Sequence, residues 1–238
     1  MLDRKNDNQH PIYLLKHYWW AYLWKPSVKF FDHQLIVNLI LFGQYKKLMR
    51  ETLDCLAKTS SEKVLQLTCV YGVLTEKIMQ LIKPQILHLT DVSMLQLELT
   101  RKKVSEEKRL NITQMNVERT AYKSDTFSST ILFFLLHEMP REARERTLSE
   151  TIRITKKGGH IVCTEYAPEP KKHWLHRFPV SRYCFERLEP FLGDFWQTDV
   201  TQTLTDLAEK QNKGIKVVSD KLFFLGFYRV TLYQIVEK

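Results

Sequence analysis

The sequence predicts an α/β fold, a mostly parallel, doubly wound sheet of seven strands with a closing β-hairpin and an N-terminal helical extension. Two observations predict it. From residue 63 onward, short apolar runs alternate with stretches of helical periodicity, which is the spacing of strand–helix–strand units. The chain then ends in two apolar runs joined around Gly226, which indicates two antiparallel strands.

The strands are predicted where short apolar runs are bounded by turn residues or by helical patterns. They cover residues 63–69, 86–90, 111–115, 130–136, 160–165, 215–224 and 227–236. Helices are expected over residues 75–82, after the capping box Ser93-x-x-Gln96, from Pro140 through Ile152, and after Thr203. Turns are expected at residues 125–129 and 156–159.

The chain divides into three parts by composition. Residues 1–10 are polar and are expected to be a flexible tail. Residues 11–60 are expected to form a helical extension or lid, with helices over residues 12–24, 28–42 and 45–57. Residues 61–238 hold the α/β domain, and an aromatic, proline-containing insertion at about 166–213 is expected to form a substrate lid.

Composition bounds the function classes. The 238-residue chain has a formal net charge of +9, which suits an anionic partner. Apolar runs are too short for a membrane-spanning helix, and residues 1–9 do not resemble a signal peptide. The four cysteines are scattered, which indicates reduced thiols and no disulfide-linked partner. Because the basic residues are also scattered and no RNA-recognition motif is present, no nucleic-acid partner is expected.

The stretch from Val64 to Thr75 organises the predicted domain. It reads as a buried strand, a tight turn at Gly72 and the start of a helix, and α/β proteins bind nucleotides at such helix N-termini. Thr68 and Val70 stand where a nucleotide-binding loop usually carries glycine. The cofactor is therefore expected to lie differently here, or against the ring of Tyr71. Ordinary loop packing of Val70 and Tyr71 is the alternative.

The motifs resemble, in order, those of the Rossmann-like class I S-adenosylmethionine-dependent methyltransferases. Gly72 matches the glycine-rich motif, and Asp91, 19 residues later, matches the acid that binds the ribose. Asn116 matches the adenine-reading position. The resemblance implies S-adenosylmethionine as cofactor and these contacts: Gln66, Cys69, Val70, Tyr71, Gly72, Thr75, Asp91, Val92, Asn116, Val117 and Phe134.

A closer resemblance covers most of the chain. Residues 18–22, 69–72, 132–138 and 188–191 are similar to segments of the rhodoquinone-biosynthesis family called RquA. The resemblance implies conversion of ubiquinone to rhodoquinone, in which an amino group replaces a ring methoxy group. It also implies S-adenosylmethionine as the amino donor and a divalent metal, preferably manganese.

His137 and Glu138 follow the most apolar strand, at the edge where open α/β sheets bind ligands. An imidazole beside a carboxylate suits a divalent metal such as Mn²⁺ or a general base, and a helix-capping or core pair is the alternative. His137, Glu138 and Glu165 are the expected metal ligands, with Glu189 or Asp194 of the lid completing the shell. The expected catalytic residues are Tyr71, His137 and Glu138.

Five aromatic residues are expected to contact the quinone: Tyr18, Trp19, Tyr22, Tyr166 and Trp196. Core packing, a lid over the site and an interfacial anchor remain open for the aromatic N-terminus. Because the isoprenoid tail of ubiquinone lies in the bilayer, a peripheral position at the membrane surface is expected, cytoplasmic and on the inner face of the inner membrane, or on the matrix side in a mitochondrion. The basic residues available for anionic lipid are Lys16, Lys25, Lys29, Lys46, Lys47 and Arg50.

Gln66 replaces the acid that usually holds the ammonium of the cofactor. We expect the loss of that acid to favour an unprotonated, nucleophilic amine, because a nearby carboxylate would keep the proton on the nitrogen. Two alternatives remain. One is a methyltransferase acting on a quinone or another apolar acceptor, and the other is a non-catalytic or nucleic-acid-binding relative.

Overall fold

The computed structural model describes residues 10–104, 108–168 and 173–238. Within these residues, seven strands form one sheet in the order β3-β2-β1-β4-β5-β7-β6. Strands β1 to β5 are parallel, and β7 is antiparallel to β5 and β6. The predicted mostly parallel sheet with a closing hairpin is confirmed. The strands are β1 (Lys63–Leu67), β2 (Ile86–Asp91), β3 (Leu110–Gln114), β4 (Phe127–Phe133), β5 (Thr155–Tyr166), β6 (Lys213–Phe223) and β7 (Tyr228–Glu237).

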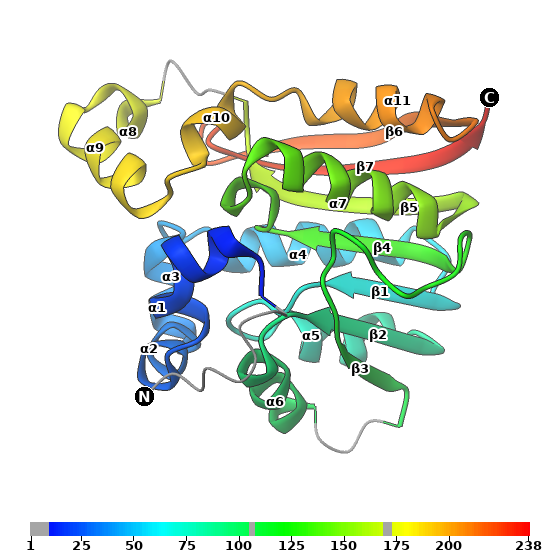
Figure 1. Cartoon of the computed structure of the whole chain (residues 1–238), viewed down its shortest axis with the longest axis horizontal. Helices are drawn as coiled ribbons and strands as arrows, with labels where there is room; N and C mark the ends of the chain where they lie inside the picture. Colours follow the sequence, from blue (N-terminus) through cyan, green and yellow to red (C-terminus); the bar gives the residue numbers. More distant parts are fainter. Residues whose placement is uncertain (1–9, 105–107, 169–172) are drawn as a thin grey trace.

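Helices cover both faces of the sheet (Figure 1). Helices α7 and α11 pack on each other and against β5 and β6, whereas α4 contacts β5 and β7 from the other face. The helices of the α/β part are α4 (Tyr45–Ala57), α5 (Leu74–Lys77), η3 (Ile78–Ile82), α6 (Met94–Lys103), η4 (Leu136–Glu138), α7 (Arg141–Ile154) and α11 (Val200–Glu209). The helices at the end of the molecule are η2 (Leu14–Tyr18), α1 (Trp19–Tyr22), α2 (Lys25–Phe31), α3 (Gln34–Ile40), α8 (Trp174–Arg177), α9 (Pro179–Leu188) and α10 (Leu192–Trp196).

The centre of the sheet is fully buried. Every residue of β4 is buried, and so are the last four residues of β1 beside it. Chain order reverses between β1 and β4, so a crevice forms outside the carboxyl ends of these strands. The N-terminal helices and the α8–α9 pair lie at this end of the molecule (Figure 1). The N-terminal helices and the α8–α9 pair are therefore near the end of the sheet at which the crevice lies.

The predicted turn at residues 156–159 is wrong. Strand β5 begins at Thr155 and runs through these residues, and the register against β4 shifts between the pairs Phe127–Thr155 and Ser129–His160. Gly158 has a φ of +76°, so the two glycines form a bulge inside the strand rather than a turn before it. Strand β4 accordingly starts at Phe127, inside the turn expected at residues 125–129.

Three helix predictions differ from the structure. The expected helix 28–42 is split into α2 and α3, because the backbone of His33 is extended. Asp32, just before it, accepts a hydrogen bond from the backbone N–H of Gly72 at 3.1 Å. The last helix starts at Val200, with Asp199 rather than Thr203 as its cap. The α5 segment continues into the π-helix η3. The expected tail lies outside the described residues except for His10.

Gly72 occupies a position that no other residue type can fill without strain. Its φ is +88°, and a Cβ there would lie 2.5 Å from the hydroxyl oxygen of Tyr45. That hydroxyl accepts a hydrogen bond from the backbone N–H of Val73 at 2.8 Å, which ties α4 to the loop after β1. Close packing of Tyr45 therefore explains why Gly72 alone is retained in this loop.

We expect Gly72→Ala to destabilise the protein more than Gly43→Ala. Gly43 also has a positive φ, +75°, but a Cβ there meets nothing within 4 Å. The control should lower the free energy of unfolding by about 1–2 kcal/mol from backbone strain alone. Gly72→Ala should add about 1–3 kcal/mol from overpacking against Tyr45. Urea unfolding of both variants measures the difference, and equal losses would contradict the role given to Tyr45.

Candidate active site

A cavity of about 300 Å³ lies outside the carboxyl ends of β1, β2 and β4. Most of its surface is apolar, and the N-terminal segment, the loops after these strands and the end of α9 contribute to its walls. The volume falls at the lower end of the range for small-molecule sites. The site therefore lies where the strand order predicts it.

Gln66 builds the loop after β1 rather than the cavity wall. Its Nε2 donates to the carbonyl of Thr68 at 3.0 Å, and its Oε1 accepts from the hydroxyl of Thr75 at 2.9 Å. Thr68 has a φ of +73°, a conformation that glycine adopts more easily. The buried amide of Gln66 thus helps to hold a threonine in a conformation suited to glycine. Gln66, Gly72 and Thr75 do not line the cavity.

Asp91 joins the ends of β1 and β2. Its carboxylate accepts hydrogen bonds from the backbone N–H of Cys69 at 2.8 Å and of Ser93 at 2.7 Å. Burial raises the pKa of Asp91 to about 6, although these backbone bonds oppose the shift. Asp91 is also one of the residues that line the cavity.

The N-terminal segment that contains Tyr18, Ala21 and Tyr22 lies over the loop after β1, and we call this segment the roof. The rings of Tyr22 and Tyr71 stack with centroids 5.8 Å apart and planes 7° apart. The hydroxyl of Tyr71 donates to the carbonyl of Ala21, and the hydroxyl of Ser93 donates to the carbonyl of Tyr22 at 2.9 Å. Tyr71 was expected to be catalytic, but its hydroxyl is committed to Ala21, so in this structure the residue packs the roof.

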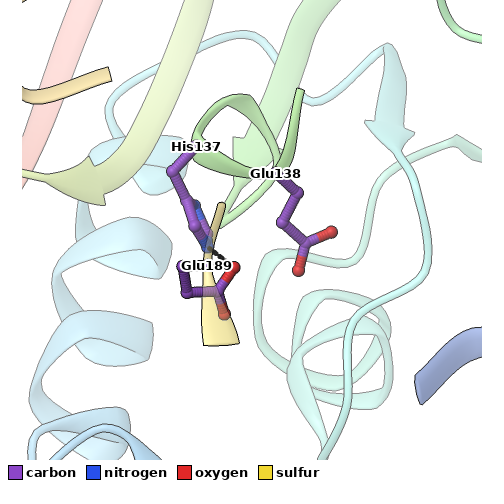
Figure 2. A group of neighbouring side chains, drawn as sticks. All are labelled: His137, Glu138 and Glu189. Atoms are coloured by element: carbon purple, nitrogen blue, oxygen red, sulfur yellow. Dashed lines mark ion pairs between the residues drawn. The ribbon is translucent and has the colours of Figure 1, made fainter. Parts of the chain in front are cut away.

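Three acid and imidazole side chains converge in the cavity (Figure 2). His137 and Glu138 come from the turn after β4, and Glu189 follows α9. One potential ligand atom from each lies within 4.8 Å of the others. Two tyrosines of the roof reach this acid–histidine cluster: Tyr22 donates to Glu138, and Tyr18 donates to Glu189 at 2.9 Å.

Glu165, at the end of β5, orients His137 through a hydrogen bond from Nδ1 of the imidazole. Its carboxylate accepts from Nδ1 of His137 at 2.8 Å and from the backbone N–H groups of Leu135 and Leu136, both at 2.6 Å. Glu165 was expected to be a metal ligand, but it lies outside the cluster, which instead includes Glu189, one of the two lid carboxylates expected to complete the shell. Asp194, the other lid candidate, pairs with Arg144 at 3.1 Å.

Arg144 supports the same turn from the opposite side. Its guanidinium is buried and donates to the carbonyls of Leu136 at 3.1 Å and Met139 at 3.0 Å. Those carbonyls flank His137 and Glu138, so the orientation of the turn is fixed by charge-assisted hydrogen bonds. Helix α7, which carries Arg144, therefore positions the cluster without lining the cavity.

The pKa values of all three side chains of the cluster are raised. Burial opposes protonation of His137, but the nearby carboxylates, Glu165 foremost, raise its pKa to about 9. Burial also raises the pKa of Glu138 and of Glu189, although the charge of His137 opposes both shifts. A group of this kind can donate or accept a proton in a water-poor cavity.

The donor set also fits a divalent cation. With Nδ1 bonded to Glu165, His137 has Nε2 left to coordinate, and the carboxylates of Glu138 and Glu189 supply oxygen ligands. A carboxylate behind a coordinating imidazole is the usual arrangement in metalloproteins. Carboxylate oxygens with one imidazole can bind several divalent metals, and Mn²⁺ is one of them.

Most of the predicted site residues meet in one cavity. Its lining includes Tyr18, Tyr22, Cys69, Val70, Tyr71, Asp91, Val92, Asn116, Val117, Phe134, His137, Glu138 and Tyr166. Two predicted substrate contacts lie elsewhere: Trp19 is exposed, and Trp196 is buried in the core. Sequence reasoning missed the lining residues Tyr13, Tyr45 and Leu188 because nothing in their spacing indicates the site.

The strand order, the loop after β1 and the acid ending β2 together define a class I S-adenosylmethionine-dependent methyltransferase fold. Solved structures agree. An O-methyltransferase family protein from Burkholderia thailandensis superposes with a TM-score of 0.56 at 12% identity, covering 91% of this chain and 64% of that one. The N-methyltransferase NodS from Bradyrhizobium japonicum gives 0.55 at 12% identity, covering 82% and 99%.

Sequence comparison is more specific. Residues 28–213 match the ubiE/COQ5 methyltransferase family, and the chain belongs to that family. The ubiquinone/menaquinone biosynthesis C-methyltransferase UbiE of Pasteurella multocida is similar at 25% identity over 209 residues, covering 85% of this chain and 76% of the relative.

We expect S-adenosylmethionine binding to weaken as the pH falls through 6. Below its pKa of about 6, Asp91 is protonated and loses the charge that attracts the ribose hydroxyls. The dissociation constant should rise about tenfold between pH 7.5 and pH 5, and calorimetry measures it. Asp91→Asn should bind more weakly, with little pH dependence. A flat profile for the wild-type protein would contradict a ribose role for Asp91.

Proposed function

We propose that the protein transfers a group from S-adenosylmethionine to the ring of a polyprenylated quinone. The observation that carries the proposal is the acid–histidine cluster, which lies in the same apolar cavity as the cofactor loop and Asp91. Support for a quinone comes from the family match and from relatives named for quinone biosynthesis.

The residues of the cavity have separate tasks in this proposal. Asp91 orients the cofactor, and the aromatic walls at Phe134 and Tyr166 pack against the quinone ring. His137, held by Glu165, and Glu138 donate or accept the protons that the ring oxygens and the acceptor atom exchange. The tyrosine roof excludes water, which strengthens these interactions.

Methyl transfer to the ring is the form that the comparisons support, since the named relatives are C-methyltransferases. In that form, a group of the cluster removes the proton that leaves the ring carbon. Glu138 is suited to this task because its pKa is raised and it lies in the cavity.

Amino transfer, the rhodoquinone reaction, is a second candidate that a specific observation favours. Gln66 carries no charge, and both of its polar side-chain atoms are bonded within the loop, so it leaves a cofactor ammonium without an ionic partner at that position. An amine that loses its proton more easily is the better nucleophile. The resemblance to the rhodoquinone-biosynthesis family agrees with this form.

We expect label from S-adenosylmethionine to appear on the quinone when the two are incubated with the protein and Mn²⁺. A cofactor labelled with ¹³C in its methyl group and ¹⁵N in its amino group separates the forms by mass spectrometry. Carbon label indicates methyl transfer, whereas nitrogen label with loss of a methoxy group indicates amino transfer. An unlabelled quinone, tested with both ubiquinone and a precursor that lacks a ring methyl group, would refute the proposal.

A divalent metal such as Mn²⁺ forms part of the proposal. Nε2 of His137 and the carboxylates of Glu138 and Glu189 would hold it. When bound there, it would supply Lewis acidity to a carbonyl oxygen of the quinone. Tyr18 and Tyr22, which donate to the same carboxylates, would help to hold Glu189 and Glu138 in place.

We expect Glu165→Gln to weaken Mn²⁺ binding by about 10–100-fold, because the amide orients His137 less firmly and lowers its basicity. His137→Ala should abolish binding at this site. Glu142→Gln, on an exposed carboxylate of α7, is the control and should bind as the wild type does. Calorimetric titration with MnCl₂ measures all three, and equal affinity in every variant would reject a metal site here.

The proposal also places the protein at a membrane surface, peripherally on the inner face of the inner membrane, or on the matrix side in a mitochondrion. A polyprenyl tail keeps the substrate within the bilayer, so the ring must be reached from the interface. Among the described residues, no helix is both long and apolar enough to cross a membrane.

A further inference from the structure

Large apolar side chains lie exposed at the end of the molecule that carries the cavity. Leu35 and Leu39 of α3 are 71% and 73% exposed. The α8–α9 segment and the tip of the β6–β7 hairpin carry similar residues. We call the set the apolar end face: Leu35, Leu39, Trp174, Phe178, Val180 and Leu225. Exposed apolar side chains that gather at one end of a protein mark a site where another protein or a membrane binds.

Ring contacts join the three elements of this face. Phe42, just after α3, lies with its ring centroid 6.1 Å from Phe185 of α9 and 5.8 Å from Phe224 of the hairpin tip. His173, just before α8, lies 4.8 Å from the same Phe224. The helices α3, α8 and α9 are seen at the same end of the molecule in Figure 1. The elements that carry the exposed residues are therefore neighbours at this end of the molecule.

The cavity reaches the exterior beside this surface. Ile40 of α3 and Leu188 of α9 line the cavity, yet they are 46% and 56% exposed. Because these two residues line the cavity and are also exposed to solvent, we infer that the cavity opens between them, and we call this opening the mouth. An apolar chain that leaves the cavity between Ile40 and Leu188 would pass directly onto the apolar end face.

Basic residues outnumber acidic residues in the helices at this end of the molecule. Helices α2, α3 and α8 contain no acidic residue, and α9 contains two arginines against one acid, Glu186. Asp32, which follows α2, pairs with Lys103. Exposed Lys25 and Lys29 lie on α2, and Arg177 lies on α8. A cationic rim around exposed aromatic and aliphatic side chains matches the headgroup region of an anionic bilayer.

We propose that the apolar end face docks on anionic bilayers and holds the mouth of the cavity against the lipid. The inference rests on the proposed function for its purpose, which is to let the quinone ring enter while its tail stays in the membrane. In this proposal, two elements that are far apart in the chain, α3 and α8–α9, insert into the bilayer on either side of the mouth.

Co-sedimentation with vesicles of phosphatidylcholine and phosphatidylglycerol tests the face. The wild-type protein should bind, and binding should weaken at high salt. The double variant Leu35→Asp/Leu39→Asp should bind about 100-fold more weakly, which corresponds to the loss of two buried leucines at about tenfold each. Leu81→Asp is the control, because Leu81 of η3 is 63% exposed but lies outside the face.

A charge variant and an activity measurement complete the test. Lys25→Glu/Lys29→Glu should weaken binding to anionic vesicles and leave binding to neutral vesicles unchanged. The Leu35/Leu39 variant should keep its kcat/KM for a quinone without a tail and lose it for a long-tailed quinone in vesicles.

Three outcomes would overturn the docking face. In the first, the wild-type protein fails to bind vesicles, and in the second, the double variant binds them as the wild type does. In the third, light scattering shows that the protein self-associates through this face, so that the double variant is monomeric where the wild type is not. Vesicle binding that follows these expectations without any quinone product would leave the face standing and reject the enzymatic proposal.

Discussion

The buried carboxylate of Glu165 is the interaction on which the site depends. Where β4 and β5 end, it accepts hydrogen bonds from the backbone N–H groups of Leu135 and Leu136 and from Nδ1 of His137. A buried charge is tolerated only when its acceptor sites are satisfied, so the turn after β4 must present its N–H groups inward. His137 follows in that turn and aims Nε2 into the cavity. Removing the carboxylate would leave the sheet intact and the turn without its organising partner.

The roof supplies hydrogen-bond donors to the two other carboxylates of the site, those of Glu189 and Glu138. Tyr18 and Tyr22 donate to Glu189 and Glu138, and burial together with these neighbours raises the pKa of each phenol. A tyrosine is suited to this position because its ring fills apolar space and its hydroxyl satisfies an acceptor. The aromatic N-terminus therefore packs against the rest of the chain, as one of the three interpretations expected, and also contributes to the wall of the cavity.

The sheet could be predicted because its strands are short apolar runs with clear boundaries. The bulge in β5 could not, because Gly158 and Gly159 have the composition of a turn whether or not the strand continues. In the site, His137, Glu138 and Asp91 were predictable because each follows a strand end. Glu189 was one of two lid carboxylates expected to complete the shell, but the place of Glu165 outside the cluster was not predictable, since it depends on which carboxylate faces which side of an imidazole. Tyr45 and Asp32 were missed because their contacts with the loop at Gly72 are tertiary.

The family match begins at residue 28, whereas the tyrosines that touch the acid–histidine cluster come before it. The floor of the cavity is thus built from the shared part of the chain and the roof from a segment beyond it. The same N-terminal segment also holds the cofactor loop, through the stacked rings of Tyr22 and Tyr71 and the hydrogen bond from Tyr71 to Ala21. A change in this short segment would therefore alter the cofactor side and the acid–histidine side of the cavity together.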